Sequence, residues 1–119
     1  MARRPASGQR GLVSPKRFEV YLVRLDPVLG SEIGKTRPGV VVSPDEANDA
    51  LRTAIVAPLT SVRRKWPTRV PVRVNKVVGD IALDQMRAVD KQRLAKRVGA
   101  LSEGETEVLL QRLAEMFAP

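Results

Sequence analysis

The chain has 119 residues, of which 43% are hydrophobic, and its formal net charge is +8. This length predicts one domain with a single hydrophobic core, and no apolar run approaches the roughly 20 residues of a membrane span. The sequence has no cysteine and no histidine, which excludes disulfides, zinc clusters, thiol nucleophiles and imidazole acid–base chemistry. Because the N-terminus also lacks the apolar segment of a secretory signal, we expect a cytoplasmic protein.

The positive charge is concentrated in two segments that contain no acidic residue, residues 1–17 and 61–76. The rest of the chain is close to balanced. A concentrated basic segment on a balanced body indicates a polyanionic partner, most often a nucleic acid. The alternative is that this charge serves only solubility.

The N-terminal half is predicted to alternate strands with polar loops. Residues 1–16 combine Pro, Gly, Ser and basic side chains without apolar periodicity, which predicts a disordered basic tail before a folded domain at 17–119. Runs of β-branched and aromatic residues then predict strands, and turn-forming or charged residues predict the connections between them. The strands fall at 17–25, 39–43, 52–60 and 68–76, with a long loop at 26–38, a polar connection at 44–50 and a basic loop at 61–67.

The strand predicted at 68–76 alternates strictly between valines and polar residues. Its valines share one face, and Arg69, Pro71 and Arg73 lie on the other, which predicts a half-exposed antiparallel strand. Pro71 has no N–H to donate, so this strand is expected at an edge or a bulge of the sheet.

The C-terminal third predicts two more strands and two helices. A strand is expected at 80–89, a short helix at 90–96 with Asp90 as its N-cap, and a short strand at 97–101. Ser102 and Glu105 have the spacing of a capping box at the start of the last helix. Apolar residues recur on one face of that helix: Leu109, Leu110, Leu113 and Phe117. The whole pattern predicts an α+β, mainly β fold, a small antiparallel barrel with short helices and a C-terminal helix.

The sequence offers little for metal or phosphate-loop chemistry. It contains neither the GxxxxGK[ST] phosphate loop nor the GxSxG nucleophile elbow. Asp80 and Asp84 lie four residues apart in a predicted strand and would share a face as possible ligands. Solvent-exposed strand ends are the interpretation that we prefer for them, and we expect no metal site.

Arg37 is the most suggestive polar residue of the long loop. Pro38 biases it toward extended backbone, from which its guanidinium can present two donors to a phosphate. If the second and third strands pair as antiparallel neighbours, Arg37 faces Thr60, immediately before the basic loop. Alternatively, Arg37 forms a surface ion pair with Glu32 or Asp26, and Thr60 satisfies a turn at the strand end.

The order of four blocks resembles the MazF/PemK family of toxin endoribonucleases, from about residue 17 to the C-terminus. The blocks are EVYLVRLDPVLGSEIGKTRPGVVVS, AIVAPLTS, WPTRVPV and LDQMRAVDKQRL. The resemblance implies a barrel related to SH3-like folds, a homodimer and metal-independent cleavage of single-stranded RNA at short sequence motifs. It also implies a cognate antitoxin whose disordered tail occupies the RNA groove.

The resemblance carries roles onto individual residues. The family's arginine before a proline falls on Arg37, and its catalytic threonine falls on Thr60. The loop's Ser-Glu pair and the family's Gln-x-Arg near the substrate groove match these positions: Ser31, Glu32, Gln85 and Arg87.

RNA brings its own nucleophile, the 2′-hydroxyl, so the protein needs only to align it, neutralise the phosphorane and move protons. We expect Arg37 to supply charge and Thr60 to donate to a phosphoryl oxygen or orient the 2′-hydroxyl. Glu32 is the candidate base. The expected products carry a 2′,3′-cyclic phosphate or 3′-phosphate and a 5′-hydroxyl.

The predicted RNA contacts come from the two loops and the Gln-x-Arg segment. The basic loop is expected to bind phosphates, and Trp66 either stacks on an unpaired base or packs against the barrel rim. The predicted RNA-binding residues are Ser31, Lys35, Ser61, Arg63, Arg64, Lys65, Trp66, Gln85 and Arg87.

The sequence therefore predicts a sequence-specific, metal-independent endoribonuclease toxin that inhibits translation and growth and is neutralised by an antitoxin. Two alternatives stay open, a non-catalytic RNA-binding barrel and a gyrase poison of the same fold. The terminal helix and neighbouring strands are expected at or near a homodimer interface.

Overall fold

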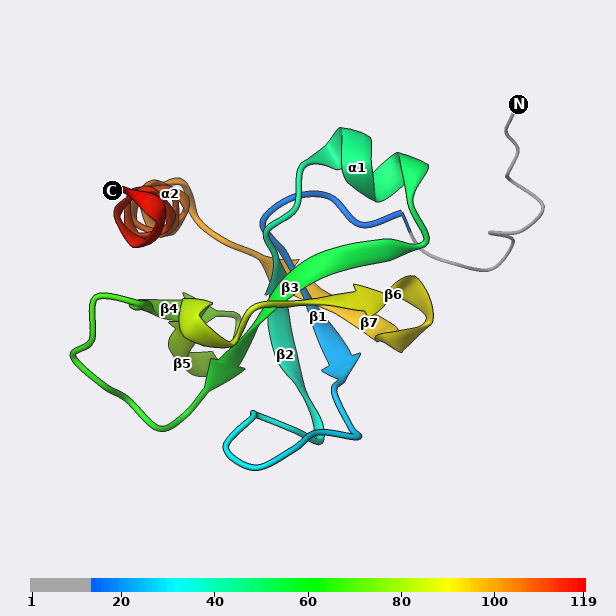
Figure 1. Ribbon diagram of the computed structural model, residues 1–119, viewed down its shortest axis with the longest axis horizontal. Helices are drawn as coiled ribbons and strands as arrows, with labels where there is room; N and C mark the ends of the chain where they lie inside the picture. Colours follow the sequence, from blue (N-terminus) through cyan, green and yellow to red (C-terminus); the bar gives the residue numbers. More distant parts are fainter. Residues whose placement is uncertain (1–13) are drawn as a thin grey trace.

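The computed structural model describes residues 14–119, so most of the predicted tail lies outside the described residues (Figure 1). The described strands join one sheet in the order β4-β5-β3-β2-β1-β7, and β6 pairs with β3 off this path. All the pairings are antiparallel. The strands are β1 (Glu19–Arg24), β2 (Thr36–Val41), β3 (Thr53–Thr60), β4 (Arg69–Val74), β5 (Val77–Ala82), β6 (Arg87–Asp90) and β7 (Leu94–Ala100). The helical elements are α1 (Asp45–Ala50), the 3₁₀ turns η2 (Leu83–Gln85) and η3 (Lys91–Arg93), and α2 (Glu103–Phe117).

The sheet curls because β3 has two partners along one edge. Its first half pairs with β6 and its end pairs with β5, while β2 runs along the other edge. At the two ends of the strand path, the Asn75 side chain donates a hydrogen bond to the Val98 carbonyl oxygen. Gly99 lies against Val74, so β4 and β7 approach each other and the sheet curls into a partial barrel. The predicted fold class is thereby confirmed, and β4 is an edge strand, as Pro71 indicated.

The core occupies both faces of the sheet. Val40 belongs to a cluster that β4, β5 and α2 cover, whereas Val41 belongs to a second cluster with Tyr21 and Val89. Successive residues of a strand point to opposite faces. A strand that is buried on both faces therefore reads as an unbroken apolar run, which explains the valines of β2.

Helix α2 begins with the predicted capping box. The Ser102 hydroxyl accepts from the Glu105 amide at 3.2 Å, and the Glu105 carboxylate accepts from the Ser102 amide at 2.9 Å. The predicted apolar face was partly wrong. Leu109 is fully buried, and Leu113 and Met116 pack against the core, but two other apolar residues are 40% and 70% exposed: Leu110 and Phe117.

The segment 80–96 departs from the prediction. The expected strand at 80–89 is divided by the turn η2 into β5 and β6, because β3 changes partner there. The expected helix at 90–96 is only the turn η3. Asp90 does cap it, accepting from the Gln92 amide at 2.8 Å, but the chain then enters β7 and pairs with β1. No helix within residues 14–119 is both long enough and apolar enough to cross a membrane.

Candidate active site

Arg37 and Thr60 belong to neighbouring strands, near the ends of β2 and β3. The pairs Gly39–Pro58 and Val40–Ala57 fix the register, and continuing it by two residues sets Arg37 opposite Thr60. Opposed residues of an antiparallel pair share a face of the sheet. The continued register would therefore bring the two predicted residues to one edge of the sheet. Arg37 itself lies in β2 and not in the preceding loop.

Both side chains are held by local hydrogen bonds. The half-buried Arg37 donates from Nε to the Gly34 carbonyl at 2.9 Å, so its terminal Nη groups are left for other partners. Thr60 is buried, and its hydroxyl oxygen accepts from the Val62 amide at 3.1 Å. A threonine hydroxyl that accepts one bond still has its proton to donate. The pair thus offers a charged fork and a neutral donor.

A pocket of about 400 Å³ lies beside this edge, between the 25–35 loop, β3 and the η2–β6 segment. It brings together three predicted residues, Glu32, Gln85 and Arg87, next to Pro58, which precedes Thr60 by two residues. Gln85 accepts from the Ile33 amide at 3.2 Å, and Arg87 donates to the Leu25 carbonyl at 3.0 Å. The Gln-x-Arg segment therefore holds the 25–35 loop in place while it lines the pocket.

The 25–35 loop is shaped by two acidic side chains. Glu32 accepts from the Leu29 amide at 2.6 Å, and Asp26 accepts from the Lys35 amide at 2.8 Å. A Cβ on Gly34 would lie 2.5 Å from the Asp26 carboxylate, so this glycine is needed for close approach. Ser31 and Lys35 are exposed on the loop. No ion pair joins Arg37 to Glu32 or Asp26 among residues 14–119.

Asp80 is the polar residue that the sequence reading misplaced. It was expected at a solvent-exposed strand end with Asp84, but it is 1% exposed and pairs with Thr60 in the β3–β5 register. Its neighbour Gly79 is pressed against β3, since a Cβ there would lie 2.5 Å from the Thr60 carbonyl oxygen. The end of β3 therefore has a fixed backbone neighbour and a buried carboxylate beside it. Asp84 lies in η2 and is partly exposed.

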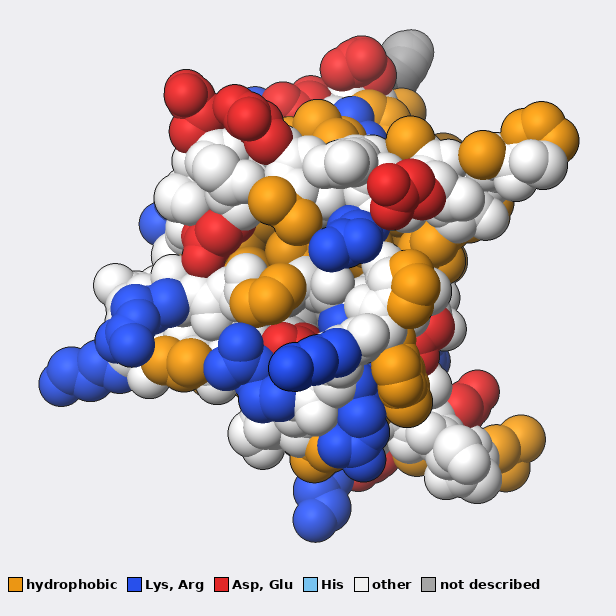
Figure 2. Space-filling view, turned by 90° about the vertical axis from the view of Figure 1, so that its left-hand side faces the viewer, with side chains coloured by type: hydrophobic (Ala, Val, Ile, Leu, Met, Phe, Trp, Pro, Cys, Tyr) orange, Lys and Arg blue, Asp and Glu red, His pale blue; other side chains and the backbone are white. Residues whose placement is uncertain are grey.

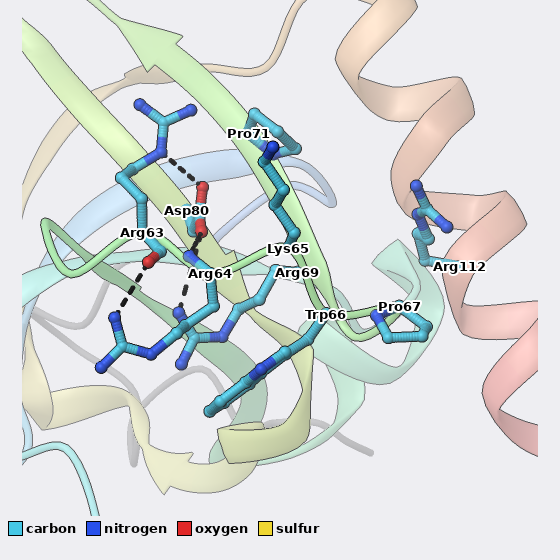
Figure 3. Close-up of a pocket in the computed structure, with 9 residues that line it drawn as sticks. All are labelled: Arg63, Arg64, Lys65, Trp66, Pro67, Arg69, Pro71, Asp80 and Arg112. Carbon is cyan, nitrogen blue, oxygen red and sulfur yellow. Dashed lines mark hydrogen bonds and ion pairs between the residues drawn. The ribbon is translucent and has the colours of Figure 1, made fainter.

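Asp80 ties together both ends of the 61–68 loop (Figure 3). One carboxylate oxygen accepts from Arg63 Nε at 2.7 Å, and the other accepts from the Arg64 amide at 2.8 Å. Arg69, at the start of β4, lies 3.8 Å from it and donates to the Val62 carbonyl at 3.0 Å. A buried carboxylate is stable only when such partners surround it. Arg69 was predicted on an exposed face but is buried. Its guanidinium lies beside the buried Asp80 carboxylate and compensates its negative charge.

Trp66 is half-exposed near the end of the same loop, and its carbonyl oxygen accepts from the Arg69 amide at 3.1 Å in the turn before β4. The guanidinium carbons of Arg69 and Arg64 lie 4.7 Å and 5.7 Å from the centre of its ring, within cation–π range. Ser61, Arg63, Arg64 and Lys65 are exposed. Trp66 is therefore not buried in the core, and the basic side chains surround it.

Cations dominate the face that carries this loop. Figure 2 views the molecule from the side of β4, β5 and the 61–68 loop, and lysine and arginine side chains gather over its lower half. A pocket of about 590 Å³ opens there between the loop and α2. Its lining residues are Arg63, Arg64, Lys65, Trp66, Pro67, Arg69, Pro71, Asp80 and Arg112.

Sequence reasoning missed Asp80, Arg69 and Arg112. Alternation placed Arg69 outside, and a lone arginine on a predicted helix carries no signal of what it faces. The nearest available signal was that residues 61–76 contain six basic residues and no acidic one. Any carboxylate that pairs with these cations must therefore come from another part of the chain. Within residues 14–119, no three carboxylates gather into a group that could hold a metal ion.

Comparison with known proteins supports one family. Residues 16–117 match the model of the PemK-like, MazF-like toxins of type II toxin–antitoxin systems. The chain is 40% identical over 96 residues to the endoribonuclease MazF of Staphylococcus epidermidis, covering 76% of this chain and 80% of that protein. It is 38% identical over 94 residues to the endoribonuclease EndoA of Bacillus subtilis, covering 74% and 81%.

Solved structures show the same fold. MazF from Deinococcus radiodurans superimposes with a TM-score of 0.76 at 23% identity, over 86% of this chain and 94% of that one. A mycobacterial endoribonuclease in complex with its cognate antitoxin also gives 0.76, at 22% identity, over 88% and 97%. On the family match and the 40% identity, the chain belongs to the PemK-like, MazF-like family of toxins.

Proposed function

We propose that this protein is an endoribonuclease toxin of a type II toxin–antitoxin system that cuts single-stranded RNA at specific short sequences. The observation that supports the proposal most is the 40% identity to a protein named endoribonuclease MazF, and the β2–β3 register, continued by two residues beyond the Gly39–Pro58 pair, would set Arg37 opposite Thr60. Cutting messenger RNA would inhibit translation and growth in the cytoplasm.

The proposed chemistry needs neither metal nor imidazole. The 2′-hydroxyl attacks the adjacent phosphorus, the bond from phosphorus to the 5′-oxygen breaks, and that oxygen takes a proton from water. One product ends in a 2′,3′-cyclic phosphate, which water can open to a 3′-phosphate, and the other in a 5′-hydroxyl. The proton lost from the 2′-hydroxyl goes to a base, for which Glu32 at the neighbouring pocket is the candidate.

Arg37 and Thr60 would stabilise the charge that develops on phosphorus. Arg37 has its Nη groups free of the Gly34 contact, and a guanidinium fork matches two phosphoryl oxygens. The Thr60 hydroxyl keeps a proton for one of them. Donors that are fixed before the reaction are worth more than flexible ones, and both side chains are anchored by local hydrogen bonds.

The remaining predicted contacts divide between two surfaces. Gln85 and Arg87 line the pocket with Glu32, and Ser31 and Lys35 lie exposed on the 25–35 loop. The exposed cations of the 61–68 loop would bind backbone phosphates, which makes affinity depend strongly on salt. Ser61 begins that loop directly after Thr60.

We also propose two protein partners. A mycobacterial relative was solved with its cognate antitoxin, and the basic face would suit an acidic segment of such a partner. The second partner is another copy of this chain, which would cover the exposed Leu110 and Phe117 of α2.

The proposal is tested by mapping cut sites in a long unstructured RNA by primer extension, with EDTA present. We expect discrete cuts, and no cut where the nucleotide before the scissile bond is 2′-deoxy. Arg37→Ala and Thr60→Ala should each lower the cleavage rate by about 100-fold to 1,000-fold, with RNA binding kept within a few-fold. Lys96→Ala, at an exposed position of β7, is the matched control and should cleave normally.

The outcomes separate the alternatives. Binding of RNA by the wild type without any cleavage would indicate a non-catalytic RNA-binding barrel. Altered plasmid topology in the presence of gyrase, with RNA left intact, would indicate a gyrase poison. Full activity of Arg37→Ala, or loss of all cleavage in EDTA, would contradict the proposed chemistry.

A further inference from the structure

We infer that the pocket between the 61–68 loop and α2 binds a nucleotide of the RNA that lies outside the bond to be cut. This inference rests on the proposed function. In it, the base stacks on the open face of Trp66, and the phosphate binds Arg112 and Lys65. The pocket measures about 590 Å³, which is within the range of small-ligand pockets.

Trp66 is built as a platform with one covered face. In Figure 3, Arg64 and Arg69 lie beside its ring, within 5.7 Å and 4.7 Å of the ring centre, and Arg112 lies farther away on α2, beyond Pro67. The indole is nevertheless 49% exposed, so a large part of the ring remains available to a ligand. An aromatic ring that is exposed and flanked by cations suits a nucleobase, which stacks without regard to its identity.

The loop that carries Trp66 is fixed at both of its ends. Arg69 is 8% exposed and is fixed by the Val62 carbonyl at 3.0 Å and Asp84 at 3.4 Å. Asp80 anchors the other end of the loop through Arg63 and the Arg64 amide. A ligand that stacks on a fixed ring spends less free energy on ordering the loop.

The opposite wall supplies donors for an anion. Arg112 Nε is buried and has no hydrogen-bond partner among the described residues. The one ion pair of Arg112 within residues 14–119 is its 3.6 Å contact with Glu115, one helical turn along α2. That buried Nε is out of reach of a ligand, but the side chain as a whole is 38% exposed and lines the pocket, so the outer part of the guanidinium can donate to a phosphate. Lys65 adds a second, exposed cation at the same pocket.

The combined chemistry selects a nucleotide over an acidic peptide. Five cations line the pocket, and its one carboxylate, Asp80, already accepts from Arg63 and the Arg64 amide. An acidic peptide would match this charge but would make little use of the indole face. A single nucleotide of RNA carries both a base, which can stack on the indole, and a phosphate, which can bind the cations.

The test uses the intrinsic fluorescence of Trp66, which is the only tryptophan of the chain. A 2′-O-methyl oligonucleotide, which cannot be cleaved, is titrated into the protein at low salt. We expect saturable quenching in the wild type, and about tenfold weaker binding in Arg112→Gln. Lys96→Ala removes one positive charge from exposed β7 and should change the affinity less than twofold.

A second measurement examines stacking without relying on the tryptophan signal. With a fluorescently labelled oligonucleotide, anisotropy should show Trp66→Ala binding about tenfold more weakly and Trp66→Phe recovering most of the affinity. Circular dichroism establishes that each variant is folded. Equal affinity of Trp66→Ala and the wild type would overturn the inference.

The inference and the proposed function can fail separately. Specific RNA cleavage without any change in Trp66 fluorescence would overturn the pocket and leave the endoribonuclease intact. Quenching by the 2′-O-methyl oligonucleotide, together with no cleavage of unmodified RNA, would overturn the endoribonuclease and leave the pocket intact. Equal weakening by Arg112→Gln and Lys96→Ala, or quenching by an acidic peptide but not by the oligonucleotide, would also overturn the nucleotide site.

Discussion

Lys91 carries an amino group into the interior of the molecule. The residue is 1% exposed, and its Nζ has no hydrogen-bond partner within the described residues. Burial lowers the pKa of Lys91, and the charge of Asp49 only partly opposes this. Burial disfavours the charged form of the amine. At a pH where Lys91 is protonated in the unfolded chain, folding must therefore either remove that proton or bury the charge, and both lower the free energy of unfolding.

We predict that Lys91→Met raises the free energy of unfolding at pH 7 by about 1 kcal/mol or more. Between the lowered pKa and the ordinary value for lysine, the unfolded chain binds more protons than the folded one, so wild-type stability rises with pH. The advantage of the variant should therefore shrink as the pH rises toward and above the ordinary lysine pKa. Urea denaturation at neutral and alkaline pH measures this.

Lys96→Met, at an exposed site on β7, is the control, and its stability should change by less than about 0.5 kcal/mol. A Lys91→Met protein that is less stable than the wild type at pH 7 would show that the ammonium is paired in solution.

Among the elements, the 61–68 loop depends most clearly on one distant side chain. Asp80 on β5 contacts Arg63, Arg64 and Arg69, so the loop is closed by a carboxylate from another strand. Loops without such anchors open easily. The rigidity of the basic loop is therefore a property of β5 as much as of the loop itself.

We predict that Asp80→Asn loosens the loop and lowers the free energy of unfolding by about 2 kcal/mol, since Arg69 would lose its charged partner inside the protein. Limited trypsin digestion reports on the loop, because Arg63, Arg64 and Lys65 are cleavage sites for that protease, and cleavage there should become faster. Asp84→Asn is the matched control, as Asp84 contacts the same Arg69 but is partly exposed. Equal digestion of the two variants would argue against the anchoring role.

Element prediction from sequence succeeded where the signal was local. The capping box of Ser102 and Glu105, and the valines of β4, depend only on nearby residues, and both were confirmed. No local sequence signal shows that η2 divides the predicted strand at 80–89. The division arises because β3 pairs with β6 in its first half and with β5 at its end. Asp80 is a similar case, since its partners lie 11 to 17 residues away.

The candidate site was predictable to the extent that it follows strand order. The apolar runs favoured the pairing of β2 with β3, which the structure has at Gly39–Pro58, and the opposition of Arg37 and Thr60 follows by continuing that register by two residues. Arg112 could not be placed in this way, because the position of α2 against the loop depends on how Leu109 packs into the core.

For the whole molecule, an apolar stripe on α2 remains uncovered. Leu110 and Phe117 are two helical turns apart, so they share a face, and they are 40% and 70% exposed. Arg112 lies on the other side of the helix, toward the loop. A second copy of the chain could therefore cover the stripe without closing the pocket.

We predict a dimer of 13.1 kDa chains at micromolar concentration, measured by light scattering after gel filtration. Leu110→Glu and Phe117→Glu should each shift the protein toward the monomer, because a charge would be buried at the interface. Val108→Glu is the control, on the opposite side of α2, and should leave the dimer intact. A wild-type monomer under these conditions would contradict the prediction.

The close packing of Gly79 against β3 has an evolutionary consequence for the candidate site. The carbonyl oxygen of Thr60 occupies the space that any side chain at position 79 would need. Selection can therefore act on the geometry around the Thr60 hydroxyl through a residue that has no side chain to offer to RNA. The site is constrained by its main chain as well as by its functional groups, and lineages that diversify their RNA preference would be expected to vary the loops and keep this strand contact.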